Sequence, residues 1–579
     1  MRRRTFVGSV GAFAFAPFAG AFADERGRIA RIGVMTDTHI GETEESCSRV
    51  RLALELFRAK GVDLIANCGD IADLHYPSGY RAYRKIFNGI FPDVASRPKE
   101  IYVFAGHDAF NYKGCGRDIM PHLQDAFADV RRLLETTNGP YDEGMINGLP
   151  YLVFPQFMDY GRFRETVERT VKANPGKPVL LFEHVPPAGT VYNSWDWGDQ
   201  KIRDILNAYP QIVEFSGHVH GSLRADNFIW QKEFTVLNAC CLQKWGGFLA
   251  CSEGRAKSSY DVLIVDFFRD RLVARRHDVR DGSEIFPEEP WTVALPFAAE
   301  TATYRRDRQK ARSVAPQFAK GAKLVVSADQ NSFKGFKLSF PEAGGKRQAF
   351  QYRIEVQRRD ADGAWETFAL REMFGDFYLR PQERTGIATE ELPASLFRAG
   401  MACRIRVTPQ NEFGLCGRAL EAEAVVPATL DTGETVFRCD RPMEEMEFEN
   451  DDGVTVKANV DGEFYRPWRQ EGRFNRLVLP KGLFVGPPGV RYRVTVEAHL
   501  RQTDDGPTWS VKLVSPKNRR NASPRMGTPG GDSGRLTYVF DFVKKPTGIS
   551  SGDTYSVIFQ WGKPGSLRLH SVTVDRMRS

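Results

Sequence analysis

The sequence of 579 residues lacks the features that mark several common classes of protein. Its nine cysteines are scattered and none forms a Cys-x-x-Cys pair, which argues against a zinc ribbon. It has no basic tract with interleaved aromatic residues, and its net charge of +7 is modest, so no nucleic-acid-binding domain is expected. Beyond the N-terminus, no apolar run is long enough to cross a bilayer.

The N-terminus has the pattern of an export signal. Three arginines follow Met1, and an apolar stretch rich in Ala and Phe ends in Ala21-Phe22-Ala23. The pair Arg3-Arg4 resembles a twin-arginine signal. An uncleaved membrane anchor is the alternative, but the apolar part is short for a span of about 20 residues. We expect cleavage after Ala23, with the mature protein in the periplasm or secreted.

Histidine and aspartate follow five strand-like apolar runs, which cover residues 32–35, 62–68, 101–104, 179–182 and 212–215. Open α/β sheets place their active sites at the ends of strands, and carboxylates and imidazoles are ligands for divalent metals. The five segments that follow the runs are Asp37-Thr38-His39, Gly69-Asp70-Ile71-Ala72-Asp73, Ala105-Gly106-His107-Asp108, Glu183-His184 and Gly217-His218-Val219-His220.

This set of motifs, in this order, resembles the calcineurin-like metallophosphoesterases over about residues 28–295. The resemblance implies a sandwich of two mixed β-sheets flanked by helices, with a two-metal site at the strand ends. The first metal would be held by Asp37, His39, Asp70 and His220. Asp70 would also bridge to a second metal, which His184 and His218 would hold. His107 would touch the substrate phosphate or the leaving group, and Asp108 would orient His107.

One position departs from the family pattern. The family has Asn before the histidine of the third motif, as a ligand of the second metal, and Gly106 stands there in this sequence. The second site is therefore expected to lack one ligand and to bind metal weakly, unless water or a nearby group replaces it. Glu183 and Asn238 are candidate substitutes.

The ligand set fits two divalent or trivalent ions, with iron, manganese and zinc as candidates. Two such ions about 4 Å apart can activate a bridging water and hold phosphoryl oxygens through an in-line attack. Because imidazole must be neutral to bind a metal, binding is expected to weaken as the pH falls towards about 6.

Further patterns in the first half complete this domain. Val50, Leu54 and Phe57 have helical spacing, with Ser48 as a candidate cap and Gly61 as a stop signal. Residues 260–276 alternate like a hairpin. Residues 189–200 contain three aromatic residues, which either form a substrate wall beside the metal site or pack the loop down: Tyr192, Trp195 and Trp197.

The second half reads as two all-β domains. Residues 301–320 form a charged linker or short exposed helix, in which the charges are expected to face solvent. Residues 321–428 show short alternating strands and resemble a fibronectin type III domain, with an immunoglobulin-like sandwich as the alternative. Cys403 and Cys416 flank a hairpin in this domain and are candidates for a disulfide.

Residues 429–579 resemble a jelly-roll module of the carbohydrate-binding kind. Three tryptophans, Trp468, Trp509 and Trp561, either stack on sugar rings or pack in the core. Contact with a carbohydrate or a cell surface through these β-domains is therefore a candidate partner interaction.

The sequence as a whole predicts a signal peptide over residues 1–23, an α/β metallophosphoesterase sandwich over residues 24–300, a linker and two β-sandwich domains. The predicted function is an exported metal-dependent phosphoesterase acting on a phosphomonoester or phosphodiester. The alternative is a cell-surface or carbohydrate-binding protein with a degenerate phosphoesterase domain. Retention of the aspartates and histidines named above favours the enzyme.

Overall fold

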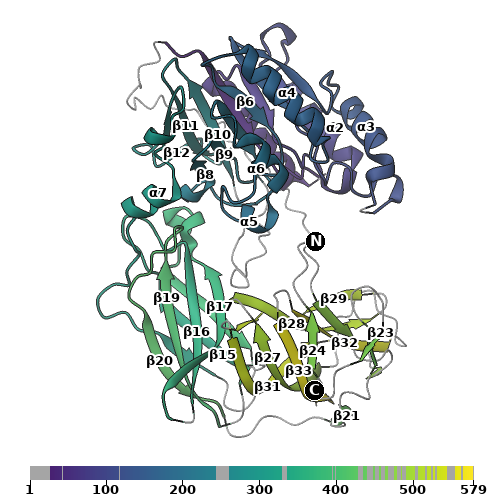
Figure 1. The fold of residues 1–579 in the computed structure, drawn as a ribbon, viewed down its shortest axis with the longest axis vertical. Helices are drawn as coiled ribbons and strands as arrows, with labels where there is room; N and C mark the ends of the chain where they lie inside the picture. The colour runs from purple at the N-terminus through teal and green to yellow at the C-terminus, as the bar shows by residue number, and fades with distance from the viewer. Residues whose placement is uncertain are drawn as a thin grey trace, which may run out of the picture.

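The computed structural model describes most of the N-terminal two thirds of the chain and, from residue 434, mainly strands. The described residues are 27–41, 43–116, 118–242, 260–328, 335–360, 362–393, 396–397, 400–427 and the strands between 434 and 577. The predicted signal, residues 1–23, lies outside them. Among the described residues, no helix is long and apolar enough to span a membrane. Figure 1 shows an α/β domain followed by two β-rich domains.

Two mixed β-sheets form the N-terminal domain, as predicted. The first sheet has seven strands in the order β12-β11-β10-β1-β2-β3, with β13 beside β11. In it β1, β2 and β3 are parallel, and β10 and β11 are antiparallel. Its strands are β1 (Ala30–Met35), β2 (Leu64–Asn67), β3 (Lys99–Tyr102), β10 (Asp261–Phe267), β11 (Arg271–Asp278), β12 (Glu284–Ile285) and β13 (Trp291–Ala294).

The second sheet has six strands in the order β4-β5-β6-β7-β9-β8. Strands β5, β6, β7 and β9 are parallel, whereas β4 and β8 run antiparallel at the two edges. The five apolar runs expected to be strands are β1, β2, β3, β6 and β7. The bounds of this sheet are β4 (Asp142–Ile146), β5 (Leu149–Val153), β6 (Val179–Phe182), β7 (Ile212–Ser216), β8 (Ile229–Gln231) and β9 (Thr235–Asn238).

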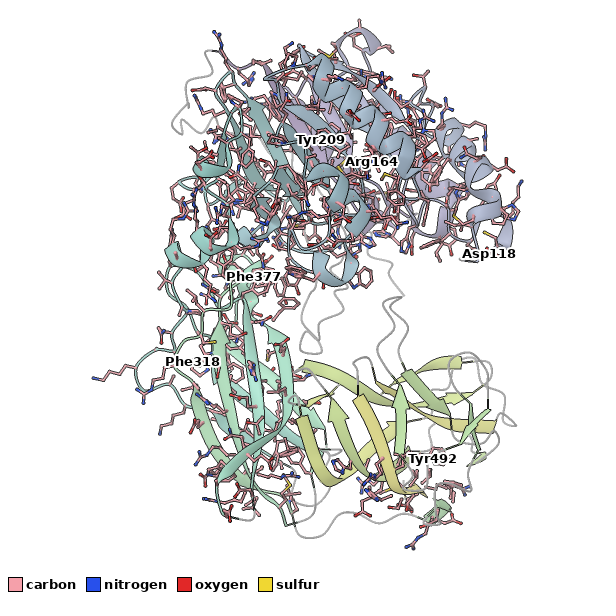
Figure 2. The ribbon with its side chains drawn as sticks, viewed as in Figure 1. Asp118, Arg164, Tyr209, Phe318, Phe377 and Tyr492 are labelled. Carbon is pink, nitrogen blue, oxygen red and sulfur yellow. The ribbon has the colours of Figure 1, made fainter. Side chains whose placement is uncertain are left out.

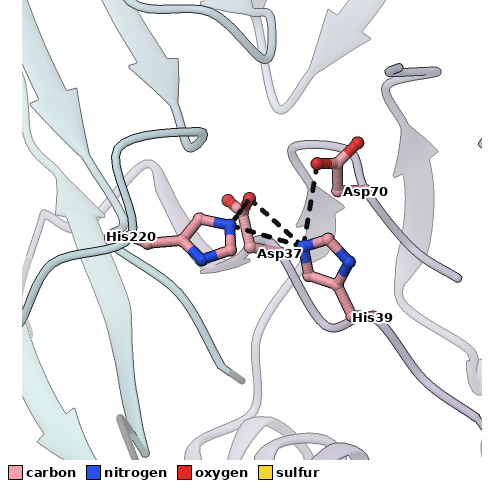
Figure 3. A group of neighbouring side chains, drawn as sticks. All are labelled: Asp37, His39, Asp70 and His220. Carbon is pink, nitrogen blue, oxygen red and sulfur yellow. Dashed lines mark hydrogen bonds and ion pairs between the residues drawn. The ribbon is translucent and has the colours of Figure 1, made fainter. Parts of the chain in front are cut away.

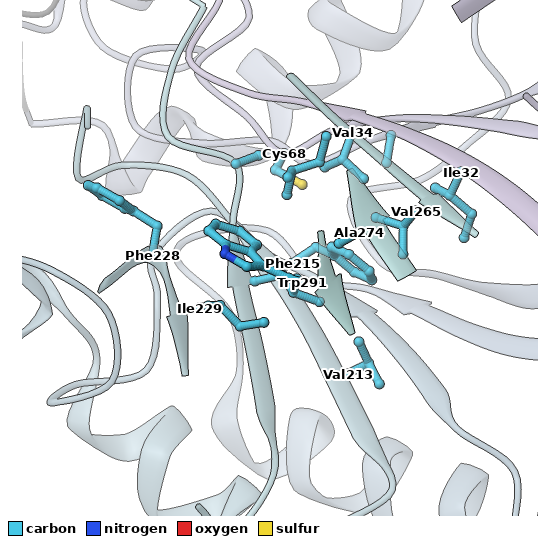
Figure 4. Close-up of a cluster of buried hydrophobic side chains, with 14 of the residues drawn as sticks. Ile32, Val34, Cys68, Val213, Phe215, Phe228, Ile229, Val265, Ala274 and Trp291 are labelled. Carbon is cyan, nitrogen blue, oxygen red and sulfur yellow. The ribbon is translucent and has the colours of Figure 1, made fainter. Parts of the chain in front are cut away.

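Four layers result from the way these sheets bury their faces. Ile32 and Val34 of the first sheet and Val213 and Phe215 of the second lie in one buried cluster between the sheets (Figure 4). Helices α1 to α3 cover the outer face of the first sheet, and α4 and α6 that of the second. The helices are α1 (Glu44–Lys60), α2 (Pro77–Ile90), α3 (Leu123–Leu133), α4 (Tyr160–Ala173), α5 (Ser194–Trp197), α6 (Gln200–Leu206) and α7 (Arg306–Arg312).

Helix α1 shows how the local sequence sets these elements. Val50, Leu54 and Phe57 are buried on one side of it, as the helical spacing predicted. Its cap is Thr43, whose side chain accepts a hydrogen bond from the backbone N–H of Ser46, so the expected cap at Ser48 is wrong. Gly61 ends the helix in the left-handed conformation, which favours glycine.

The segment after residue 300 contains a short helix, one of the two predicted alternatives, but Arg306 in it does not face solvent as its charge predicted. Arg306 of α7 donates hydrogen bonds to the backbone carbonyls of Thr190, Asn227 and Ile229 in the N-terminal domain. Gln309 is buried and donates to the carbonyl of Asp226. Burial lowers the pKa of Arg306 to about 10. This basic helix therefore fastens the N-terminal domain to the rest of the chain.

The second domain is a β-sandwich. A three-stranded sheet, β14-β15-β18, lies apart from the strands β20-β19-β16-β17, and the apolar faces of both form one cluster. Cys403 and Cys416 are not joined by a disulfide, because Cys403 is buried beside the carbonyl of Ala424 and Cys416 is exposed. The strands are β14 (Val325–Ser327), β15 (Gly335–Pro341), β16 (Gln351–Arg359), β17 (Trp365–Phe374), β18 (Ile387–Pro393), β19 (Ala402–Gln410) and β20 (Leu420–Val425).

The third domain is all β and joins the second edge to edge. Strand β17 pairs with β30 at Leu370 and Gly527, so one twelve-stranded sheet runs through both domains. A five-stranded sheet, β21-β33-β27-β31 with β24, forms its other layer. Its longer strands are β27 (Arg491–Gln502), β28 (Gly506–Ser515), β31 (Gly531–Val543), β32 (Thr554–Trp561) and β33 (Gly565–Arg576).

The shorter strands of the third domain complete its two layers. They are β21 (Glu434–Cys439), β22 (Glu447–Glu449), β23 (Thr455–Lys457), β24 (Glu463–Arg466), β25 (Asn475–Val478), β26 (Phe484–Val485), β29 (Asn518–Ala522) and β30 (Met526–Thr528). The side chains of the three tryptophans named for sugar stacking lie outside the described residues.

Candidate metal centre

Backbone hydrogen bonds bring the loops after the strands together. The N–H of Asp37 donates to the carbonyl of Gly69 at 2.9 Å, and that of His39 donates to the carbonyl of Asp70 at 3.0 Å. The backbone N–H of His218 donates to Asp37 Oδ2 at 2.9 Å, which joins the second sheet to the first. Asp37 in the first motif and His220 in the last are 183 residues apart along the chain, and these hydrogen bonds bring the motifs together at one place.

Four of the predicted metal ligands form one group (Figure 3). The ligand atoms of Asp37, His39, Asp70 and His220 all lie within 4.8 Å of one another. His220 Nε2 is 2.8 Å from Asp37 Oδ1, and His39 Nε2 is 3.7 Å from Asp70 Oδ2. This is the set of carboxylate oxygens and imidazole nitrogens expected for the first metal.

The donor set of this group fits a cation. Asp37 Oδ1 is buried and accepts no hydrogen bond of good geometry, although His220 Nε2 lies close to it. The Nε2 atoms of His39 and His220 face each other at 3.3 Å. Electron pairs that point at one another in this way are stabilised by a positive ion between them.

Asp70 also lies beside the residues expected to hold a second metal. Asp70 Oδ2 is 3.3 Å from His184 Nε2, which is 3.2 Å from His218 Nδ1. His184 Nδ1 donates to the carbonyl of Cys68 at 2.8 Å, so Nε2 is left to face Asp70 and His218. Asp70 thus stands between the two groups, as a bridging ligand would.

The carboxylates and imidazoles of the centre shift one another's pKa values. Burial alone would raise the pKa of Asp37, but His220 and His184 hold it well below its usual range. Against the effect of burial, hydrogen bonds with Asp37 and Asp73 raise the pKa of His39 to about 10, and Asp70 raises that of His184 to about 9. A metal must therefore displace protons from these imidazoles when it binds.

Backbone strain is concentrated at the same residues. Five of the six candidate ligands have a positive φ, a region that side chains other than glycine rarely adopt. Such conformations cluster at functional sites because the surrounding structure must hold them in place. The residues and their φ angles are Asp37 (48°), His39 (37°), Asp70 (50°), His218 (70°) and His220 (43°).

Gly217 permits the close approach of the two sheets at this centre. A Cβ atom on Gly217 would lie 1.9 Å from Thr36 Oγ1 and 2.3 Å from Asp37 Oδ2. Any side chain there would push the loop that carries His218 away from Asp37.

His107 stands at the rim of the centre and contacts Asp73. His107 Nδ1 is 2.5 Å from Asp73 Oδ1, and the His107 and His39 rings meet edge to face with centroids 4.8 Å apart. The candidate ligand atoms of His107, Asp73 and His39 also lie within 4.8 Å of one another. Asp73 lies within a motif noted in the sequence, but no role was predicted for it.

Asp108 does not orient His107, so that prediction is wrong. Its carboxylate is buried and accepts hydrogen bonds from the backbone N–H groups of Ile71, Ala72 and Ala105 and from the hydroxyl of Tyr80. Burial raises the pKa of Asp108 to about 6. Asp108 therefore holds the second and third motif loops together.

The space beside Gly106 is filled by other side chains. A Cβ atom there would lie 2.9 Å from Phe110 Cζ and 3.1 Å from Gln156 Oε1, and the backbone N–H of Gly106 donates to Gln156 Oε1 at 2.6 Å. The two suggested substitutes differ in what surrounds them. Asn238 Oδ1 accepts a hydrogen bond from the backbone N–H of Cys240 at 3.0 Å. Glu183 is buried beside Glu214, and burial and Glu214 raise its pKa.

The three aromatic residues of the loop at 189–200 have different surroundings. The Trp197 ring lies 5.2 Å from that of His218, next to the centre. Tyr192 packs on Phe228 and Phe350, and Trp195 is 82% exposed. Trp197 alone of the three borders the candidate ligands among the contacts of the described residues.

Comparison with known protein families gives one match. The sequence profile of the family described as calcineurin-like phosphoesterases matches residues 30–222. A search of curated proteins finds no match.

Solved structures similar to parts of the chain include two phosphatases and a cellulose-binding domain. A dimetal phosphatase from Danio rerio is 11% identical over 46% of this chain and 99% of that chain, with a TM-score of 0.28. A purple acid phosphatase from yellow lupin (Lupinus luteus) is 12% identical over 46% of this chain and 53% of that chain, with a TM-score of 0.32. The second N-terminal cellulose-binding domain of β-1,4-glucanase C from Cellulomonas fimi is 16% identical over 26% of this chain and 100% of that chain, with a TM-score of 0.17.

Proposed function

We propose that the N-terminal domain hydrolyses a phosphomonoester or phosphodiester by metal-activated water. Residues 30–222 of this domain match the calcineurin-like phosphoesterases, so the domain is a metal-dependent phosphoester hydrolase. One observation carries the proposal: Asp70 lies between the group of Asp37, His39 and His220 and the pair His184 and His218.

The ligands of the two metals would be the residues that converge there. Asp37, His39, Asp70 and His220 would hold the first, and Asp70, His184 and His218 the second. Two bound cations would supply an activated water and neutralise charge on the phosphoryl oxygens. Iron, manganese and zinc all suit this mixture of imidazole and carboxylate ligands. The second position would be weaker, because Gly106 offers no side chain.

His107 and Asp73 would act on the substrate from the rim. Hydrogen bonds with His107 and His39 hold the pKa of Asp73 well below its usual range, so Asp73 is ionised. The Asp73 carboxylate at Nδ1 holds the orientation and tautomer of the His107 ring. His107 would thus hold a phosphoryl oxygen or give a proton to the leaving group.

A direct test measures metal content and hydrolysis together. The purified, metal-loaded chain is assayed against a chromogenic phosphomonoester, a phosphodiester and nucleotides. We expect Asp70→Asn to lose hydrolysis and both metals, and Asp118→Asn, a change at an exposed position, to keep both. A chain that holds its metals and hydrolyses none of these esters would favour the alternative of a degenerate, binding-only domain.

Export of the protein is a further proposal, supported by the arginines and the small-residue cleavage site at the N-terminus. Sequencing the N-terminus of the mature protein should find Asp24 or a close neighbour first. Intact Met1 on cytoplasmic protein would contradict it. Contact with carbohydrate through the third domain likewise remains a proposal, which a binding assay on polysaccharides would test.

A further inference from the structure

A cavity of about 300 Å³ lies between the phosphoesterase domain and the second domain. We call it the interdomain cavity and define it by Arg224, Phe286, Arg347, Phe377, Arg384 and Glu412. Arg224 follows β7 and Phe286 follows β12, whereas the other four come from the second domain. Figure 2 labels Phe377 at the junction of the two domains. The volume is at the lower end of the range of small-molecule sites.

Two guanidinium groups in its wall have buried nitrogen atoms without a partner. Arg224 pairs with Asp278 through Nη2 at 2.8 Å, but its Nε makes no hydrogen bond, and the side chain is 9% exposed. Arg347 pairs through Nη2 with Asp226 and Glu289, and its Nη1 makes no hydrogen bond. Buried donors of charged groups are normally satisfied, so both atoms call for an acceptor.

Arg384 adds a third cation to the wall. Its Nε and Nη2 donate to the carbonyl of Leu379 at 3.2 and 3.0 Å. Burial, followed by the like charge of Arg224, lowers the pKa of Arg384, while the charge of nearby Glu342 acts in the opposite direction. The wall therefore brings like charges together, which is unfavourable unless an anion lies between them.

The neighbouring acids are shared among several cations. Asp226 and Glu289 are the two carboxylates that pair with three cations, which are Arg276, Lys346 and Arg347. Glu412 also lines the cavity, and burial and the nearby Asp226 raise its pKa. The wall therefore holds three arginines, two of which, Arg224 and Arg347, keep a buried nitrogen without an acceptor.

We propose that the interdomain cavity binds a tetrahedral oxyanion, as inorganic phosphate or as the phosphate group of a small monoester. Guanidinium groups recognise such oxygens with paired hydrogen bonds, and four oxygens can accept from three arginines that approach from different sides. The Phe286 ring, over which Arg347 lies at 3.7 Å, and the Phe377 ring give the cavity an apolar wall for the organic part of a monoester.

The bound anion would join the two domains. Arg224 belongs to the phosphoesterase domain and lies four residues after His220, while Arg347 and Arg384 belong to the second domain. An anion held by all three therefore stabilises the junction. The site does not depend on hydrolysis at the metal centre.

The test uses the full-length chain, treated with a chelator so that no metal-bound phosphate contributes. Inorganic phosphate and phenyl phosphate are titrated separately by calorimetry, and the melting temperature is followed at each concentration. We expect saturable binding with a rise in melting temperature. Arg384→Gln should weaken binding at least tenfold, and Lys346→Gln should weaken it less. Arg418→Gln, at an exposed position outside the cavity, should bind like the natural chain.

The relative affinities identify the source of the phosphate group. Tighter binding of phenyl phosphate than of inorganic phosphate assigns the site to a monoester, and the reverse assigns it to free phosphate. Equal binding by Arg384→Gln and Arg418→Gln, or no saturable binding by the natural chain, would overturn the proposal. Neither result bears on hydrolysis, which the metal-loaded chain reports separately.

Discussion

At the scale of single residues, His107 and Asp73 are the most exposed side chains of the centre. They are 32% and 43% exposed, compared with 23% for His220 and at most 4% for Asp37, Asp70 and His184. A substrate that enters from solvent therefore meets this pair first, and the pair is well placed to handle a proton.

Replacement of Asp73 by Asn tests the pair. Without the carboxylate at Nδ1, the His107 ring is no longer held in one orientation and tautomer, and we expect kcat to fall about tenfold to hundredfold. Metal content should change little, because Asp73 is not among the proposed ligands. The comparison is Asp108→Asn, which should lower the free energy of unfolding by about 2–3 kcal/mol by disturbing buried hydrogen bonds. Equal kcat in Asp73→Asn and the natural chain would remove the proposed role.

Gly106 is constrained by space and not by its backbone angle. Ala at this position should lower the free energy of unfolding by about 1–3 kcal/mol, because its Cβ would press on Phe110 and Gln156. Asn should supply a second-metal ligand only when the Phe110 ring is reduced. We therefore expect Gly106→Asn with Phe110→Ala to bind the second metal more tightly than Phe110→Ala alone. Titration with metal measures the affinity of the second site in both variants. Two sites of equal affinity in the natural chain would show that a substitute ligand already exists.

His277 makes stability depend on pH without touching the centre. It is buried in β11, where burial, followed by the charge of Lys60, lowers its pKa to about 4. The unfolded chain binds this proton near pH 6.5, so stability is complete above that pH and is lost as the pH falls towards 4. The difference corresponds to about 3 kcal/mol.

The measurement compares urea unfolding of the natural chain and His277→Gln at pH 7 and pH 4. The natural chain should lose more stability on acidification than the variant, by about that amount. His122→Gln, a change nearer the surface, should behave like the natural chain. Parallel losses in all three proteins would contradict the assignment.

At the scale of elements, α7 and the loop at 189–200 act together. Arg306 donates to the carbonyl of Thr190, and the same loop carries Trp197 to the ring of His218. A change in α7 should therefore reach the metal centre through this loop.

Arg306→Gln tests this link. Loss of charged hydrogen bonds to three carbonyls should lower the free energy of unfolding by about 2–4 kcal/mol and weaken the metal site near His218. Arg305→Gln removes only an exposed ion pair with Asp307 and should cost at most about 1 kcal/mol. Calorimetric melting curves of both variants provide the comparison, and equal melting temperatures would show that α7 contributes nothing special.

At the scale of the whole molecule, the phosphoesterase domain does not bury its core alone. Phe350, Phe374, Phe377 and Tyr378 of the second domain belong to the same buried cluster as Phe215 and Trp291. Aromatic side chains bury about 150–250 Å² each, so removal of these four exposes a large apolar surface.

Truncation shows how far this dependence goes. A chain that ends at residue 300 contains every proposed catalytic and metal-binding residue, but we expect it to melt well below the natural protein and to aggregate. A chain that ends at residue 427 keeps the packing against the phosphoesterase domain and should retain hydrolysis of a chromogenic phosphoester. Comparable melting temperatures of the two truncated chains would show that the junction is unimportant.

Several features of this protein were determined by the sequence alone. The strand runs before Asp37, Asp70, His107, His184 and His218 were predicted correctly, because apolar periodicity and chain length are local properties. The order of the motifs indicated the family, and ligand chemistry follows from residue type. The roles of these residues in metal binding remain predictions, although the structure brings them together.

Only the tertiary structure decided the contacts between segments distant in the chain. The pairing of His107 with Asp73 in place of Asp108, the filling of the space at Gly106 by Phe110, and the burial of Arg306 depend on how loops and domains pack. The contacts that a side chain makes with distant segments produce no periodic pattern in the sequence around it. The cations of the interdomain cavity come from both domains for the same reason, and only the docking of those domains placed them together.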